Sequence, residues 1–188
     1  MANPMRNKII GIVAAIAPLD DLEREHRDST IEWIRSGAPI FRTQKPDVPP
    51  MHLVSYFALV DERRKKLLLV DHKIASLWLP SGGHVEPDED PRATVVRELT
   101  EELNLAAEFI HPEPLFITVT RTLGYGDHTD VSLWYLLHGD SSHAIEFDRG
   151  EFHSVRWFGF DEIPFERSDP HMRRFVAKLR RSLAAQAV

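Results

Sequence analysis

GHVEPDEDPRATVVRELTEELNL, from Gly83 to Leu105, is the segment that constrains this chain most. Pro91 suits a first helical turn, and no helix breaker interrupts the residues from Arg92 to Leu103, so the segment predicts a loop followed by a helix. With about 100° of rotation per residue, one face of this helix carries Glu98, Glu101 and Glu102. The neighbouring face carries Val95, Val96, Leu99 and Leu103. One face is therefore expected to pack and the other to be acidic.

The acidic face has two interpretations. It can be a solvated surface held by pairs such as Arg97 with Glu101, each of which stabilises a helix by only about 0.2–0.5 kcal/mol. Glu98, Glu101 and Glu102 also repel one another at these spacings, and a hard divalent cation would neutralise that repulsion. We therefore favour a site for a divalent metal and phosphate.

The segment resembles the Nudix box, GX5EX7REUXEEXGU, in which U is an aliphatic residue. The matching positions are Gly83, Glu89, Arg97, Glu98, Leu99, Glu101, Glu102 and Leu105. Asn104 replaces the final glycine, at a helix end that needs left-handed backbone, where Asn is the commonest substitute. The resemblance extends from about His52 to about Pro164. It implies an α+β fold, a Nudix-type mixed β-sheet sandwiched by helices, here with an N-terminal helical extension and a C-terminal helix.

The resemblance also implies roles for individual residues. The metal ligands would be Glu98, Glu101, Glu102 and the Gly83 carbonyl. The catalytic set would be Glu98, Glu101, Glu102, Arg97 and Glu151. Arg97 would orient the glutamates by ion pairing, Glu89 would organise the loop, and Glu98 and Glu151 compete for the role of general base.

Residues around the loop are candidates for substrate binding: Gly82, Gly83, His84, Trp78 and His128. For Trp78, stacking on a base competes with ordinary core packing, which is the default for a large aromatic residue. His84 and His128 have the alternative of surface or packing positions. These alternatives stay open at the level of sequence.

The implied reaction is magnesium-dependent hydrolysis of a phosphoanhydride bond in a nucleoside diphosphate linked to a group X, with manganese as a second candidate cation. The downstream patterns that we associate with ADP-ribose, dinucleoside polyphosphate and NADH enzymes of the family do not match this chain: Pro112 and Pro114 come too early and Tyr125 too late. A nucleoside triphosphate or a modified nucleotide is therefore the expected substrate of this pyrophosphohydrolase. The alternative is a nucleotide-sensing or scaffold module without turnover.

The composition of the chain limits which binding partners and metal ions we expect. A chain of 188 residues with 43% hydrophobic content can bury one sizeable core, and a net charge of -6 disfavours a dedicated nucleic-acid binder. There is no cysteine, and none of the ten histidines has H-E-x-x-H spacing, so magnesium or manganese is expected at the acidic site rather than zinc. We expect a cytoplasmic protein without membrane association and leave a homodimer open.

The chain is expected to divide into an N-terminal extension with a linker, residues 1–50, and a catalytic domain, residues 51–188. The apolar run Ile9–Ile16 is interpreted as a packed segment, and Asp20 is expected to cap a helix that ends near Ser36, with Leu22 among its apolar contacts. A hairpin is predicted from His52–Val60 and Lys66–Asp71. The remaining predictions are strands at Leu115–Thr122, Val131–His138 and Ser154–Gly159, a loop at Gly124–His128, and a last helix over Pro170–Ala185.

Overall fold

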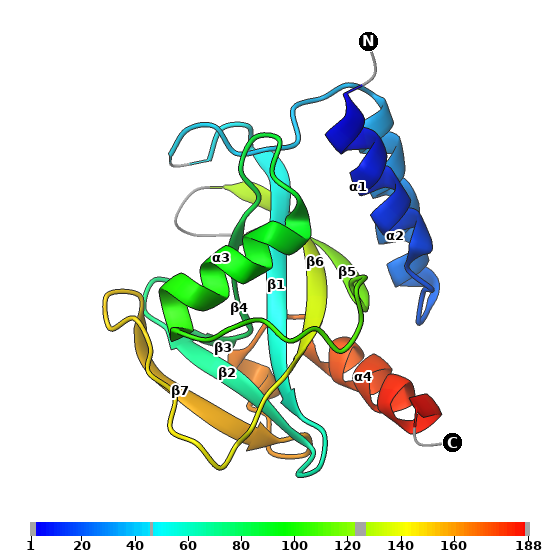
Figure 1. Cartoon of the computed structure of the whole chain (residues 1–188). Helices are drawn as coiled ribbons and strands as arrows, with labels where there is room; N and C mark the ends of the chain where they lie inside the picture. The colour runs from blue at the N-terminus through cyan, green and yellow to red at the C-terminus, as the bar shows by residue number, and fades with distance from the viewer. Residues whose placement is uncertain (1–2, 46, 123–126, 187–188) are drawn as a thin grey trace. The chain divides into compact units, whose positions relative to one another are not determined.

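The computed structural model describes residues 3–45, 47–122 and 127–186, with the side chain of residue 186 excepted, and Figure 1 shows its helices and strands. Residues 124–126 of the predicted loop lie outside these ranges. The helices are α1 (Pro4–Ala15), α2 (Asp21–Arg35), α3 (Pro91–Leu103) and α4 (Met172–Gln186), with a short 3-10 helix at Phe165–Arg167. The strands are β1 (Met51–Asp61), β2 (Lys66–His72), β3 (Leu77–Leu79), β4 (Ser81–His84), β5 (Phe116–Thr122), β6 (His128–His138) and β7 (Phe152–Gly159).

The strands of the described residues form one sheet, with the order β3-β2-β1-β6-β5, while β4 pairs with β1 and β7 pairs with β2. The α+β class is confirmed, and so are the predicted hairpin of β1 with β2 and the three later strands, within a few residues at their ends. Compact packing divides the chain into two units. The first comprises residues 1–56, 82–95 and 113–135, and the second comprises residues 57–81, 96–112 and 136–188. The predicted boundary after residue 50 stays a prediction.

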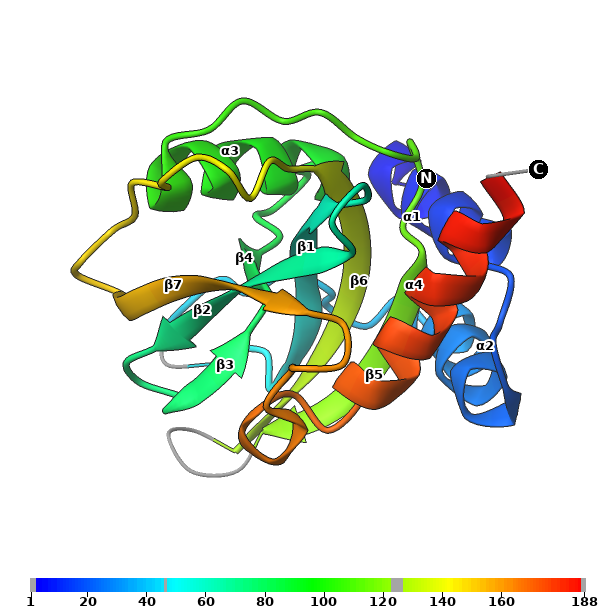
Figure 2. The ribbon, with the colours of Figure 1, turned by 90° about the horizontal axis from the view of Figure 1, so that it is seen from below.

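In the first unit, α1 and α2 lie side by side, as Figures 1 and 2 show. The sequence did not predict α1 as a helix. Asn3 caps it by accepting the amide of Met5 at 2.9 Å, and Arg6 donates from one guanidinium nitrogen to the carbonyls of Ile34 at 2.8 Å and Ala38 at 2.7 Å. These last two bonds link α1 to the end of α2 and to the residues that follow it.

Helix α1 also reaches the loop that precedes α3. The Asn3 side chain donates to Asp88 at 3.0 Å, and the ammonium of Lys8 forms an ion pair with Asp90. The N-terminal segment is thus bonded to the Nudix-like loop.

Helix α2 buries a polar face. Asp20 caps the helix by accepting the Glu23 amide, as predicted, and Gly37 follows it with a φ of +84°. Against β5, Glu23 accepts the amide of Ile117 at 3.4 Å, and His26 accepts that of Val119 at 3.3 Å. The prediction that Leu22 packs was wrong, because its side chain is 41% exposed and the buried positions of the helix are Glu23, His26, Thr30 and Ile34.

In the second unit, β2 pairs antiparallel with β3 on one side and shares a long register with β7, and these strands run beside one another in Figure 2. Helix α4 was predicted over nearly the observed range, and it buries Met172, Phe175 and Leu179 at helical spacing. Among the described residues, none of the helices combines the length and apolar character that crossing a bilayer requires.

Candidate active site

Helix α3 forms over the predicted residues and ends as predicted. Asn104 follows its last residue with a φ of 51°, the left-handed conformation that commonly closes a helix. Val95, Leu99 and Leu103 are buried. The prediction for Val96 was wrong: it is 43% exposed, because the apolar stripe of α3 is narrower than the sequence suggested.

The loop before α3 is organised by Glu89. Its carboxylate accepts the amide of Glu86 at 3.0 Å and the hydroxyl of Thr94 at 2.7 Å, so it links the loop to the first turns of the helix. The hydroxyl of Ser55 in β1 donates to the carbonyl of Pro91 at 2.9 Å and fixes the start of the helix. These bonds give Glu89 a role in shaping the loop, in line with its expected function.

Gly82 lets β4 approach β1 closely. Its φ is +155°, and a Cβ atom at this position would lie 2.2 Å from the Ser55 carbonyl oxygen and 2.8 Å from the Tyr56 Cα. No side chain larger than hydrogen fits there without backbone movement.

Three predicted residues of α3 lie together in the second unit. Arg97 donates to Glu98 at 2.5 Å and lies 3.9 Å from Glu101. The Glu98 side chain is 15% exposed, whereas that of Glu101 is 63% exposed. Burial raises the pKa of Glu98 even though Arg97 opposes the shift. Glu98 is thus a carboxylate held in a partly dehydrated position by its neighbour.

Glu102 is the most enclosed carboxylate of the helix. It is buried, and the hydroxyl of Ser81 donates a hydrogen bond to it. The pKa of Glu102 is raised to about 9, mainly by burial and further by the charges of Glu98 and Glu151 and a hydrogen bond to Glu151, while the hydrogen bond from Ser81 opposes the shift. Such strongly perturbed carboxylates are common where a cation or a proton has a functional role.

Glu151 belongs to the same group of acids, although it lies far along the chain, just before β7. The amide of Asp148 donates to the Glu102 carbonyl at 2.7 Å, and the amide of Lys73 donates to the Glu151 carbonyl at 3.0 Å. These backbone bonds hold the segment from Asp148 to Glu151 in place. The Glu151 carboxylate interacts electrostatically with both Glu98 and Glu102. The coupled acids are Glu98, Glu102 and Glu151, with the exposed Glu101 beside Glu98.

This donor set fits a hard cation. Carboxylate oxygens are the ligands that Mg²⁺ and Mn²⁺ prefer. Burial is the main cause of the two raised pKa values, and repulsion between the carboxylates adds to it; a bound dication would relieve that repulsion. Ser81 was missed at the level of sequence, where a lone serine before two glycines carries no specific signal.

The other predicted site residues are distributed between the units. Trp78 lies in the second unit, where its ring meets Phe158 edge-on at 5.0 Å, and its carbonyl accepts the Ser168 hydroxyl at 2.5 Å. Its role in substrate binding stays a prediction beside this packing role. Gly82, Gly83, His84 and His128 belong to the first unit, and their roles toward substrate or metal stay predictions as well.

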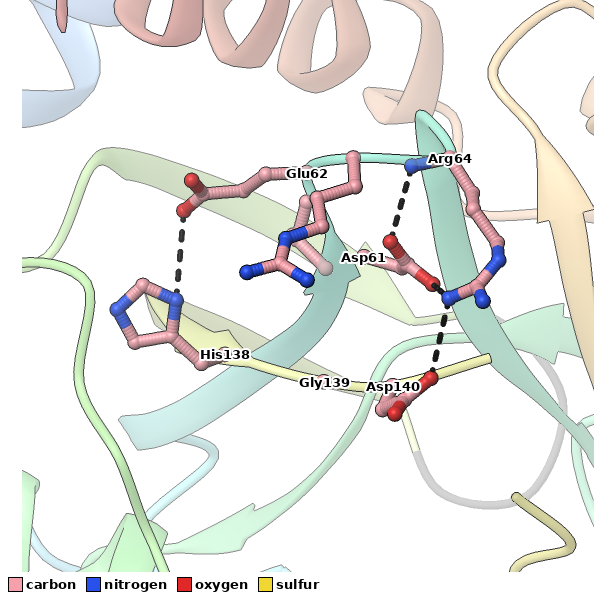
Figure 3. Close-up of a pocket in the computed structure, with 8 residues that line it drawn as sticks. Asp61, Glu62, Arg64, His138, Gly139 and Asp140 are labelled. Carbon is pink, nitrogen blue, oxygen red and sulfur yellow. Dashed lines mark hydrogen bonds and ion pairs between the residues drawn. The ribbon is translucent and has the colours of Figure 1, made fainter. Parts of the chain in front are cut away.

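A hollow of about 310 Å³ lies elsewhere in the second unit, at the turn between β1 and β2, and Figure 3 shows its charged lining. Arg64 links Asp61 at 3.0 Å to Asp140 at 3.1 Å, and His138 lies 3.4 Å from Glu62. Asp61 also accepts the amide and the hydroxyl of Ser141, at 3.0 and 2.7 Å. Despite burial, these hydrogen bonds hold the pKa of Asp61 well below its ordinary value. These bonds join residues of the lining to one another and to the adjacent Ser141, so we interpret the hollow as a stabilised turn.

Comparisons with known proteins agree with the resemblance to the Nudix family. The chain is 43% identical over 61 residues to the CTP pyrophosphohydrolase of Escherichia coli (strain K12). The aligned region covers 30% of this chain and 45% of that protein. It is 29% identical over 117 residues to the RNA pyrophosphohydrolase of Cereibacter sphaeroides, which covers 53% of this chain and 72% of that protein. The chain thus spans less than half of the length of the CTP enzyme.

Solved structures share the fold. The MutT NUDIX hydrolase from Burkholderia pseudomallei is 25% identical, with a TM-score of 0.56 over 67% of this chain and 95% of that one. An Ap4A hydrolase from C. elegans superposes with a TM-score of 0.59 at 18% identity, over 71% and 98% of the two chains, which shows the fold alone. The sequence profile of the NUDIX domain matches residues 51–179. The chain therefore belongs to the Nudix family.

Proposed function

We propose that this protein is a magnesium-dependent Nudix hydrolase that cleaves a phosphoanhydride bond in a nucleoside diphosphate linked to a further group. The observation that carries the proposal is the electrostatic coupling of Glu98, Glu102 and Glu151. Burial raises the pKa of Glu98 and of Glu102, and the charge of the exposed Glu151 contributes to both shifts. Surface salt-bridge partners do not need to be buried beside like charges. In a cation site, carboxylates can lie buried beside one another because the bound ion offsets their repulsion.

In this proposal Glu98, Glu101 and Glu102 hold the cation, with the Gly83 carbonyl as a further ligand. A bound dication supplies charge neutralisation at the phosphate oxygens and lowers the pKa of bound water. Arg97 positions Glu98 through their 2.5 Å bond. Glu98 and Glu151 are the two candidates for the base that takes the proton from the attacking water, and mutating each to Gln should identify which one acts.

The substrate we propose is a nucleoside triphosphate or a modified nucleotide. Two relatives support it, because one is named a CTP pyrophosphohydrolase and the other an RNA pyrophosphohydrolase. The test should therefore include CTP, the other common nucleoside triphosphates, modified nucleotides and a 5′-triphosphorylated RNA. Phosphate and pyrophosphate release, measured with magnesium present, would rank them.

The decisive variant is Glu102→Gln, with Glu108→Gln as its matched control. Glu102 is buried in the acidic group, whereas Glu108 is exposed outside α3. The Glu102→Gln protein should fold but lose most activity, because an amide is a neutral and poorer ligand for a hard cation. If it retained activity within about threefold of wild type, the metal assignment would be wrong, given the large contributions of catalytic metals.

Metal depletion completes the test. After chelation, activity should return with magnesium or manganese and not with zinc alone, because the ligands of this site are hard oxygens. A folded protein that binds nucleotides and turns over none of the panel would instead support the alternative, a nucleotide-sensing module.

A further inference from the structure

A second group of potential metal ligands lies in the first unit, and it shares no residue with the glutamates of the proposed catalytic site. Its members are Asp47, His52 in β1, His84 in β4, and His128 and Asp130 in β6. They form two overlapping trios that share His52: one with Asp47 and His84, the other with His128 and Asp130. Within each trio, one ligand atom per residue lies within 4.8 Å of the others.

His52 is the centre of this group, and its tautomer can be assigned. It is completely buried, and its Nδ1 lies 2.8 Å from the Pro49 carbonyl oxygen, which can only accept a proton. Nδ1 therefore carries hydrogen, and in the neutral ring Nε2 presents a lone pair. This arrangement, in which a carbonyl orients one ring nitrogen and frees the other, is typical of metal-bound histidines.

The lone pair of His52 faces a carboxylate. Nε2 of His52 and Oδ1 of Asp130 lie 3.2 Å apart, both are buried, and neither takes part in a well-aligned hydrogen bond. Two acceptors at this distance repel one another unless a positive species lies between them. That species is either a proton on His52 or a metal ion.

His128 lies between two carboxylates. Its Nε2 is 3.4 Å from Asp130 Oδ2, its Nδ1 is 3.4 Å from Asp47 Oδ2, and its ring stacks on His52 with centroids 5.4 Å apart. In a tetrahedral zinc site with bonds of about 2.0–2.1 Å, neighbouring ligand atoms lie about 3.3 Å apart. The Asp130 carboxylate lies 3.4 Å from His128 Nε2 and 3.2 Å from His52 Nε2, close to that edge.

We propose that this group binds one zinc ion, with His52, His128 and Asp130 as ligands. His84 belongs to the other trio, and its ring centroid lies 4.8 Å from that of His52, so it lies beside the proposed ligands. Asp47 then acts as the outer carboxylate that orients His128 through Nδ1. Two imidazoles and one carboxylate favour zinc over magnesium.

Neighbouring groups affect how strongly an ion binds. Thr122 donates to Asp130 Oδ2 at 3.3 Å, which orients that carboxylate. Arg42 lies 3.9 Å from Asp47 and brings a positive charge that disfavours a cation. Without an ion, burial lowers the pKa of His52, but its interactions with the Asp130 carboxylate and the Pro49 carbonyl raise it above its ordinary value, so a buried imidazolium–carboxylate pair is the competing arrangement. The experiment must separate these two states.

Zinc content and thermal unfolding separate them. Wild-type protein, stripped with a chelator and then supplied with Zn²⁺ alone, should bind one equivalent. Its melting temperature should rise by about 5–10 °C at a zinc concentration near 100 times the dissociation constant. A protein that binds no zinc at micromolar concentrations, with an unchanged melting temperature, overturns the proposal and supports the imidazolium pair.

Two variants and two controls locate the site. His52→Gln and Asp130→Asn should lose the bound equivalent and the thermal shift, and Asp130→Asn preserves the side-chain volume if His52→Gln fails to fold. His143→Gln changes a histidine whose side chain is 78% exposed, and it should behave as wild type. Glu102→Gln should also keep the zinc-dependent shift, because its carboxylate belongs to the other site. If the Asp130→Asn protein binds zinc as tightly as wild type, the proposed ligands are wrong.

Discussion

The hydroxyl of Ser81, at the first position of β4, donates to the carboxylate of Glu102, 21 residues further along the chain. Both residues are buried. A carboxylate with one oxygen held in this way keeps its remaining lone pairs in a fixed direction, which is the usual contribution of an outer partner to a metal site.

Ser81→Ala should therefore weaken magnesium binding without removing it. Loss of an outer partner typically reduces metal affinity by about 10–100-fold. We expect the magnesium concentration for half-maximal activity to rise by that factor, with little change at saturating metal, as measured by titrating magnesium at fixed nucleotide. An unchanged magnesium dependence would show that Ser81 only fills space. Ser76→Ala, an exposed serine in the turn before β3, is the control.

Asn104→Gly should leave stability unchanged or raise it by about a few tenths of a kcal/mol, because glycine adopts the left-handed conformation without strain. The Asn104 side chain donates to Glu146 at 3.2 Å, but this bond is exposed and contributes little. Urea unfolding gives the comparison. A loss greater than about 1 kcal/mol would mean that the amide bond to Glu146 matters more than its exposure suggests.

Replacing glycine by alanine at three positions of the first unit should have three different effects on the free energy of unfolding. Gly82→Ala forces a Cβ to 2.2 Å from a backbone oxygen, and we expect a loss of more than about 3 kcal/mol. Gly37→Ala has open space but a φ of +84°, for a cost of about 1–2 kcal/mol. Gly11→Ala, in the exposed face of α1, should stabilise by about 0.5–1 kcal/mol. Denaturant unfolding of the three proteins would measure the order, and a tolerated Gly82→Ala would contradict the close approach of β4 to β1.

Asp61→Asn should destabilise the protein in a pH-dependent way. Asp61 accepts bonds from Ser141 and Arg64 that hold its folded-state pKa below the ordinary value of 3.8. Its stabilising contribution is therefore present above about pH 4 and is lost as the pH falls through the folded-state pKa. We expect a loss of about 1–3 kcal/mol at pH 7, shrinking toward pH 3, from urea unfolding at both values. A difference that stays constant across this range would exclude the carboxylate charge as its source.

Local features of the sequence were predicted well. Helix α3, the cap at Asp20 and the left-handed Asn104 follow from signals within a few residues, and the structure confirms each of them. The β1–β2 hairpin follows from two apolar strands around a charged turn. Such signals act through the backbone of neighbouring residues, so one sequence is enough to find them.

Features that depend on distant parts of the chain were not predicted. Helix α1 has a short run of Ile, Val, Ala and Gly without a clear amphipathic pattern, and its bonds from Arg6 to α2 are what reveal its place. The prediction for Leu22 failed because α2 turns Glu23 and His26 toward β5. His52 and Asp130 were not considered as a pair, since no local spacing connects residues that strand pairing brings together.

The polar face of α2 has a consequence for how the protein should be shortened. Among the described residues, the strand that pairs with β5 is β6, and the amides of Ile117 and Val119 donate to Glu23 and His26. A truncated protein that comprises only residues 51–179, the range of the family match, would lack this helix. Its Ile117 and Val119 amides would then be open to pairing with a strand from another molecule. We therefore expect the N-terminal segment to protect this strand edge from self-association. Aggregation of a trimmed protein would then result from the loss of α2 and not from a defect in the catalytic domain.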